Sequence, residues 1–197
     1  MKVLPDKITR TVAPSSYPVT TAEAKSHLRV DIADDDTLIA SMISAATDYV
    51  ENYTGRAFVT RTYRADLMNF YDFIELPMEP IIAISNIKYY NTSSPSVLTT
   101  LSSSVYALVN NKIYRNFGSS WESVYPRVDA VQITFTAGYA PTSSPEVAAE
   151  SVPDAIKASI LLIVGDLYEH RETSITGLMY TRTRTVEMLL NPYRVYQ

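Results

Sequence analysis

The sequence predicts an α+β fold: a mainly helical core with an antiparallel β-sheet inserted between its second and third helices. Near both ends of the chain, apolar residues recur at three- and four-residue spacing, which is typical of amphipathic helices. Between Arg56 and Ala140 the pattern changes to short runs rich in Val, Ile, Thr, Tyr and Phe, broken by Pro, Asn and Ser, which indicates strands. No helix separates these runs, which excludes a doubly wound parallel fold.

The length of 197 residues suits one domain with a core of its own. Hydrophobic residues make up 46% of the chain, so it can bury enough apolar surface to fold. We expect a single domain, 1–197, in which 17–55 and 152–197 form the helical core. The β insertion then covers 56–140 and a linker covers 141–151.

The first helix is expected near 20–29, behind a capping box. The Thr20 side chain can accept a hydrogen bond from the backbone of Glu23, and the Glu23 side chain can reach back to Thr20. His27 lies on this helix, where a structural role is favoured because no positioned nucleophile accompanies it.

The second helix is expected near 35–54. Asp34 stands where this helix would begin, and a carboxylate is favoured there by the helix dipole. Gly55 stands where a left-handed cap would end it. Together with Asp31, the Asp34–Asp36 run could instead bind a divalent cation. The spacing of a calcium loop is absent, so capping is favoured.

The inserted sheet is expected to contain six short strands. Asn110 and Asn111 tolerate a positive φ, which predicts a tight hairpin between the fourth and fifth strands. The expected strands are Phe58–Leu67, Phe73–Leu76, Ile84–Asn91, Val105–Val109, Lys112–Arg115 and Val131–Ala137.

The third helix is expected near 153–171, with Pro153 at its first helical position. The run Ile160–Val164 is apolar all round, which predicts a helix enclosed on most sides and packed on the second helix. A last short helix is expected near 185–190, stopped by Asn191-Pro192.

Composition disfavours most catalytic classes. The chain has no Cys and two His, and it lacks a Gly-x-Ser-x-Gly elbow and a Gly-rich phosphate loop. A net charge of −4 argues against a dedicated nucleic-acid binder. The second histidine, His170, suits a helix end. Neither a membrane span nor a signal peptide is predicted, so we expect a soluble cytoplasmic protein without cofactor or metal.

Two groups of residues are candidates for protein contacts. Tyr180, Arg182 and Arg184 alternate with threonines and favour a protein interface, since two arginines are too few to hold DNA. The terminal segment Tyr193–Gln197 carries two aromatics after a proline. Either a partner covers this segment or it folds back on its own core, and the sequence leaves both alternatives open.

Seven short blocks of the sequence, taken in order, resemble those of tailed-phage head-tail connector (neck adaptor) proteins, in the larger type with a β insertion. The blocks are Pro18–Asp31, Asp34–Ile39, Ala45–Arg56, Phe135–Tyr139, Val152–Ala158, Tyr168–Glu172 and Leu190–Val195. The resemblance implies a non-enzymatic adaptor in the virion neck, assembled in the host cytoplasm of a phage or prophage.

The resemblance also implies partners. Copies of the chain would form a ring, expected to be dodecameric on the portal protein, and the ring would extend the DNA channel. A stopper or tail-completion protein would bind the other side, and double-stranded DNA would make only passing, non-specific contacts. Portal docking would fall to Tyr193, Arg194, Val195 and Tyr196. In isolation the chain can remain monomeric.

Two other functions stay open. The chain could be a monomeric virion or surface binding module that uses a tyrosine-rich β insertion, since the chain has 15 Tyr. The other is a hydrolase with an unrecognised serine site, which the low histidine count disfavours.

Overall fold

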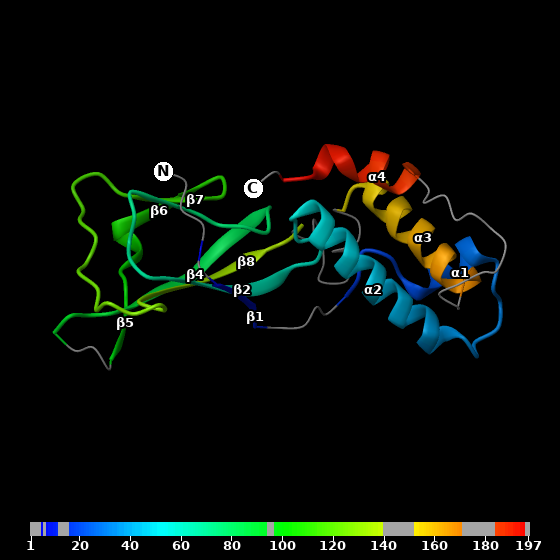
Figure 1. Ribbon diagram of the computed structural model, residues 1–197, viewed down its shortest axis with the longest axis horizontal. Coiled ribbons are helices and arrows are strands. Elements are labelled where there is room, and N and C mark those ends of the chain that lie inside the picture. The colour runs from blue at the N-terminus through cyan, green and yellow to red at the C-terminus, as the bar shows by residue number, and fades with distance from the viewer. Residues whose placement is uncertain are drawn as a thin grey trace. The chain divides into compact units, whose positions relative to one another are not determined.

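The computed structural model describes residue 5 and residues 7–11, 16–93, 97–139, 152–170 and 184–195. The chain forms two compact units (Figure 1). The strand unit comprises Met1–Pro14 and Thr60–Tyr139, and the helical unit comprises Ser15–Val59 and Ala140–Gln197. The α+β class is confirmed. The expected division into helical core and β insertion lies close to the unit boundaries, although the chain forms two compact units where the sequence predicts one domain.

The helical unit is built around α2 and α3, which pack on each other as the sequence predicts. Helices α1 and α4 both pack against α3 (Figure 1). Apolar residues from all four helices are buried in the core, among them Ala24, Ile39, Ile43, Val50, Ile156, Ile160 and Leu190. The elements are α1 Thr21–Leu28, α2 Asp36–Thr54, α3 Asp154–Glu169, α4 Arg184–Leu190 and the 3₁₀ turn η3 Asn191–Tyr193.

Helix α1 begins with the predicted capping box. The backbone N–H of Glu23 donates to the Thr20 hydroxyl at 3.1 Å, and the Thr20 N–H donates to the Glu23 carboxylate at 2.7 Å. Helix α2 ends at Gly55, whose φ of 70° is the left-handed conformation expected there.

Two predicted helix starts are wrong by one residue. Helix α2 has Asp35 and not Asp34 as its N-cap, and no side chain caps it, because a turn from Ala33 to Asp36 places Asp34 one position too early. Helix α3 has Pro153 as its N-cap and begins at Asp154. The Pro153 carbonyl accepts the first hydrogen bonds of that helix, from the N–H groups of Ile156 and Lys157. The backbone of Pro153 itself is not helical, so the proline lies just outside the helix.

The expectation that α3 is enclosed on most sides is also wrong. Ile160 and Val164 are buried, but Leu162 is 37% exposed and Leu167 is 38% exposed. The other described helices cover one side of α3 and leave part of its apolar run exposed.

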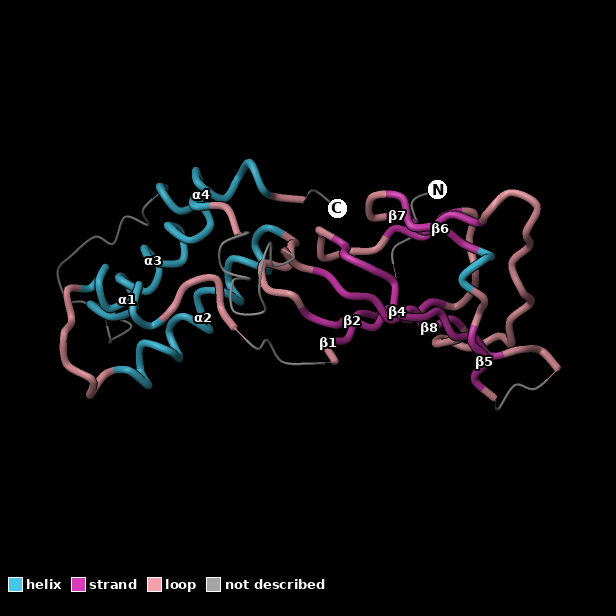
Figure 2. Tube along the Cα trace, turned by 180° about the vertical axis from the view of Figure 1, so that it is seen from behind, coloured by secondary structure: helices cyan, strands magenta, loops and turns pink. Residues whose placement is uncertain are grey.

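The described residues of the strand unit form two antiparallel sheets, where the sequence predicts one (Figure 2). The larger sheet has the order β1-β2-β8-β4-β5 and the smaller one β3-β7-β6. The predicted hairpin is confirmed: β6 and β7 pair through a turn in which Asn110 has a φ of 58°. The strands are β1 Lys7–Arg10, β2 Arg61–Leu67, β3 Phe73–Glu75, β4 Ile81–Tyr90, β5 Leu98–Thr100, β6 Tyr106–Val109, β7 Lys112–Arg115 and β8 Val131–Ala137.

Cross-strand aromatic packing supports the larger sheet. Tyr63 on β2 lies directly opposite Phe135 on β8, and their rings stack with centroids 5.6 Å apart. Both side chains are almost completely buried, as are Ile87 on β4 and Ile133 on β8, which also pair. Such pairs are the main stabilising units of a sheet.

Two edge strands, β1 and β5, were not predicted. Both are short and neither contains a buried residue, so they lack the strong alternation that reveals a strand in sequence. They form because β2 and β4 offer backbone groups for pairing. Several predicted boundaries also move: β2 begins at Arg61, β3 ends at Glu75, and β4 spans Ile81–Tyr90. Ser103–Val105 form a 3₁₀ turn, η1, so β6 begins one residue later than predicted.

Glu51 is a fully buried carboxylate at the end of α2, and its Oε1 accepts the backbone N–H of Phe58 at 2.9 Å. We expect Glu51→Ala to lower the free energy of unfolding by about 2–3 kcal/mol, because it removes the acceptor of a buried N–H. Glu51→Gln keeps an acceptor oxygen and should lose clearly less. Urea unfolding measures both, and equal losses would contradict the assigned role.

The capping box predicts a pH dependence. Burial raises the pKa of Glu23, but the hydrogen bonds from the Thr20 backbone and hydroxyl, with the charge of Lys157, outweigh it and lower the pKa below its ordinary value of 4.5. A lowered folded-state pKa stabilises the fold above the unfolded pKa, and this stabilisation is lost as pH falls through the folded value.

Glu23→Gln should therefore destabilise the chain at pH 7, by about 0.5 kcal/mol because the carboxylate is exposed. Thermal unfolding at pH 7 and at pH 3 tests this. The difference between the two chains should narrow at pH 3, and a difference independent of pH would refute the effect.

Candidate functional site

The C-terminal segment returns to the end of α2. The backbone N–H of Val195 donates to the Thr54 carbonyl at 2.8 Å, and Arg56 Nε donates to the Tyr193 carbonyl at 2.6 Å. Thr54 is the last residue of α2, so its carbonyl has no partner within the helix. Of the two alternatives for the tail, the structure shows the folded-back arrangement through Val195.

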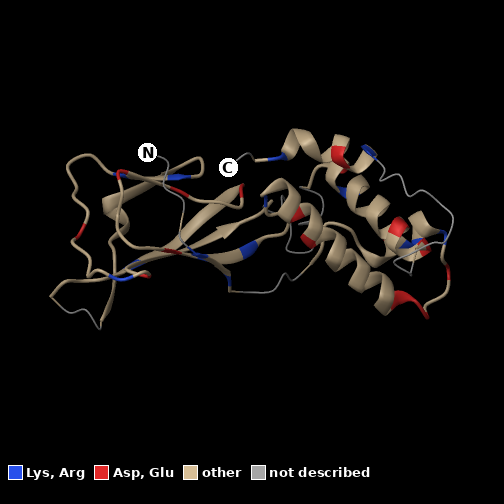
Figure 3. Cartoon of the chain, viewed as in Figure 1, with Lys and Arg blue, Asp and Glu red and all other residues tan. Residues whose placement is uncertain are grey.

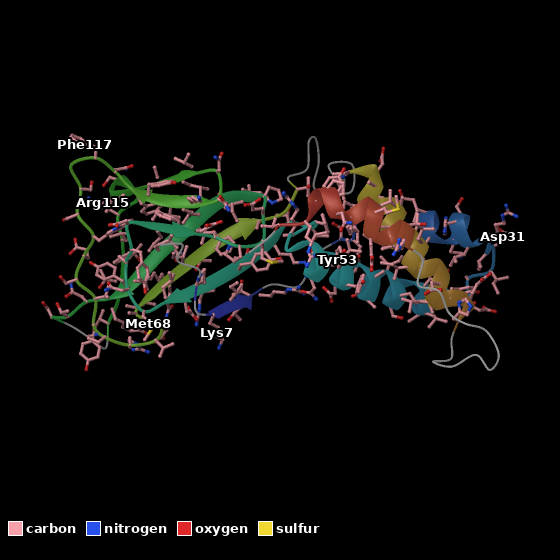
Figure 4. All side chains as sticks on the ribbon, turned by 45° about the horizontal axis from the view of Figure 1, so that its top comes forward. Lys7, Asp31, Tyr53, Met68, Arg115 and Phe117 are labelled. Atoms are coloured by element: carbon pink, nitrogen blue, oxygen red, sulfur yellow. The ribbon has the colours of Figure 1, made fainter. Side chains whose placement is uncertain are left out.

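Aromatic side chains of α2 support the same segment. The Tyr53 hydroxyl donates to Asn191 Oδ1 at 3.1 Å, and the guanidinium of Arg194 lies 5.1 Å from the centre of the Tyr53 ring. Tyr49 stacks on Tyr53 with centroids 6.2 Å apart (Tyr53 is labelled in Figure 4). Since Arg194 itself is exposed, the segment combines a fixed backbone with an accessible cation.

The remaining candidates are only partly described. Tyr196, Tyr180 and Arg182 lie outside the described residues. Arg184 is the exposed first residue of α4, whereas Tyr193 follows the end of that helix. Seven helical residues span about 10 Å, so the structure places these two candidates at opposite ends of α4.

A groove of about 850 Å³ opens in the helical unit beside α3. The partly exposed residues of the α3 apolar run, Leu162 and Ile163, contribute to its wall. The run Ile160–Val164 is the sequence signal for this groove, although its apolar character by itself predicts an enclosed helix. The lining residues are His27, Leu28, Arg29, Tyr49, Leu162, Ile163, Gly165, Asp166, Tyr168, Glu169, Thr185, Val186 and Glu187.

Among the described residues that line the groove, we find no catalytic arrangement. The two basic residues of the groove, His27 and Arg29, come from the end of α1, and Gly165 allows the ring of His27 to lie near α3, 3.6 Å from where a Cβ would stand. The Asp166 carbonyl accepts the backbone N–H of His170, and its carboxylate oxygen Oδ1 lies 3.3 Å from His170 Nδ1. The first contact joins α1 to α3 and the second closes the end of α3, and neither places a nucleophile beside a base.

The aspartates at the start of α2 are used in helix packing. Asp36 accepts from Lys25 Nζ at 2.7 Å, and Asp35 accepts from the Tyr168 hydroxyl at 2.5 Å. Within the described ranges, no group of three or more His, Asp or Glu is placed to hold a metal. The helices described there are also too short or too polar to cross a membrane.

In the strand unit, one turn presents an aromatic side chain to solvent. We call Arg115–Ser119, which follows β7, the Phe117 turn. The relative accessibility of Phe117 is 108%, the highest among the exposed large hydrophobic residues described. Figure 4 shows Phe117 pointing away from the ribbon. Sequence analysis missed this residue, although a lone Phe before Gly in a polar stretch was a visible signal.

Charged pairs elsewhere in the strand unit stabilise loops. Arg127 binds both carboxylate oxygens of Asp129 at 2.5 and 2.9 Å, and its guanidinium lies 3.9 Å from the centre of the Tyr90 ring. The hydrogen bond from Arg127 lowers the pKa of Asp129. This cluster is satisfied internally, so it is a structural feature and not a site for a ligand.

The comparisons with known proteins identify the family. The family model described as phage gp6-like head-tail connector protein matches residues 19–135, more than half of the chain. The chain belongs to this head-tail connector family. It is therefore a structural connector protein of a phage-like particle, as the resemblance of its sequence blocks implies. A search of curated proteins finds no match.

Solved structures share the fold over nearly the whole chain. A chain from the neck of an empty gene transfer agent (GTA) particle, computed with C6 symmetry, is 22% identical with a TM-score of 0.76, over 97% of this chain and 96% of that one. A chain from the native GTA neck computed with C12 symmetry is 20% identical with a TM-score of 0.76, over 97% and 96%. A chain from the native GTA virion is 21% identical with a TM-score of 0.74, over 96% of each chain.

The attachment of the connector's tail can be tested with one residue. Val195→Pro removes the N–H that binds the Thr54 carbonyl, and the extended conformation of Arg194 accepts a following proline. We expect this variant to unfold at a lower temperature than wild type, measured by scanning calorimetry. Val195→Ala keeps the N–H and is the control. Equal unfolding temperatures of the two variants would show that the hydrogen bond does not fix the segment.

Proposed function

We propose that copies of this connector form a ring under the portal protein, extend the DNA channel and join the head to a stopper or tail-completion protein. The observation that carries the proposal is the family match over residues 19–135. The whole-length likeness to chains from necks computed with C6 and C12 symmetry supports a ring. Twelve copies on the portal is the stoichiometry we propose.

The charge of the chain suits a conduit for DNA. It has 17 Lys and Arg against 21 Asp and Glu, and Figure 3 shows acidic residues at the start of α2 and on α3 and α4. A channel lined by many cations would bind phosphates and slow the passage of DNA. We infer only transient, non-specific DNA contacts, and a role without enzymatic activity, in the virion neck after assembly in the host cytoplasm.

The C-terminal segment is the proposed portal contact, through Tyr193, Arg194, Val195 and Tyr196. Its attachment to α2 through Val195 would present the exposed Arg194 from a fixed position, which lowers the entropy cost of binding. Between neighbouring copies, we propose contacts through Tyr180, Arg182 and Arg184.

Light scattering and electron microscopy of the purified chain, with and without the cognate portal protein, test the ring. We expect a portal complex that carries a ring of the connector, whether or not the free chain is monomeric. A chain that stays monomeric at high concentration and does not bind the portal protein would contradict the proposal and favour the monomeric binding module.

The same assay tests the docking segment. A chain that ends at Pro192 should fold, as judged by circular dichroism, but lose portal binding. Val195→Pro is the matched variant, because it weakens the attachment to α2 and keeps the other side chains. It should bind the portal more weakly than wild type and more tightly than the truncated chain. Full binding by the truncated chain would remove the segment from the portal contact.

A further inference from the structure

A ring requires two different surfaces on the same chain. In a closed ring of identical copies the contact is head-to-tail, so each copy offers one surface to the neighbour on one side and a different surface to the other. If the proposed ring is correct, the chain must therefore carry a complementary pair. The described residues contain a projecting aromatic turn in the strand unit and an open groove in the helical unit.

The Phe117 turn is supported at several points. The Asn116 side chain donates to the Ser104 carbonyl at 2.8 Å, and its backbone N–H donates to the Val105 carbonyl at 2.8 Å. Arg115 donates to the Ser119 carbonyl at 2.9 Å, across the turn. These bonds preorganise the backbone of the turn, so mainly the rotamer freedom of the Phe117 side chain is lost on binding.

The groove suits an aromatic side chain in both size and lining. Its volume of about 850 Å³ lies within the range of sites that enclose a substantial ligand group. Leu28, Leu162, Ile163 and Val186 supply apolar walls, and Tyr49 supplies a ring. Aromatic side chains in apolar pockets are among the strongest contributors to protein interfaces.

The charges of the two surfaces are complementary. Arg115, which is exposed, adds a cation to the same turn as Phe117 (both are labelled in Figure 4). The groove is lined by three acidic residues, Asp166, Glu169 and Glu187, against Arg29 and the histidine His27. Opposite charges at the rim of an interface favour the correct pairing and its rate of formation.

We infer that the Phe117 turn of one copy inserts into the α3 groove of the neighbouring copy, and that this contact joins copies around the ring. The inference rests on the proposed ring and assigns it a specific interface. It predicts that Phe117→Ala weakens ring assembly by about tenfold or more, as for a central interface aromatic. Met68→Ala removes another exposed apolar side chain, 51% accessible, and is the matched control.

Because the chain has no Cys, disulfide cross-linking gives a direct test. Phe117→Cys chains and Leu162→Cys chains are mixed on the portal and oxidised. The mixture should give covalent dimers only, since each chain carries one half of the contact. The double variant should give a ladder of larger species. A mixture of Met68→Cys and Leu162→Cys chains should give no cross-link.

The outcomes separate this inference from the proposed function. Normal rings that do not cross-link, or that assemble equally well with Phe117→Ala, would overturn the Phe117 contact and leave the ring in place. A double variant that forms only an internal disulfide would also overturn it. If the wild-type chain forms no ring on the portal, both the proposed function and this contact fail.

Discussion

The carboxyl end of α2 is the point on which the helical unit depends. Gly55 ends the helix in a left-handed conformation, and the Glu51 carboxylate then accepts the N–H of Phe58 as the chain leads on towards the strand unit. The last carbonyl of the helix, that of Thr54, accepts from Val195. One helix end thus fixes both the exit of the chain, through the Glu51 side chain, and the return of the C-terminal segment, through the Thr54 carbonyl. That carbonyl can accept from Val195 because the last carbonyls of a helix have no partner within it.

This arrangement suits a connector, whose role is to present surfaces to several partners. The C-terminal segment, which we propose as the portal contact, gains by being fixed in advance, because less entropy is then lost on binding. The tyrosines contribute to that fixation: Tyr53 binds Asn191 and lies beneath Arg194. Some of the 15 tyrosines therefore stabilise the chain itself, and not all of them are available for contacts with other proteins.

The elements that sequence analysis predicted well depend on local interactions. The Thr20 capping box, the Gly55 cap and the Asn110 hairpin are each formed by residues within a few positions of one another. The edge strands β1 and β5 were missed because they depend on pairing with β2 and β4. The split into two sheets was missed for the same reason, since partner choice is not a local property.

The sequence by itself determined the class of the fold, most helix and strand positions and the connector family, because periodicity, caps and motif blocks are all properties of the linear chain. Only the tertiary structure decided that the tail lies against α2, that part of the α3 apolar run opens into a groove, and that Phe117 is fully exposed. An apolar residue has the same hydrophobicity in a core and on a contact surface. Which of the two it occupies depends on what the rest of the chain packs against it.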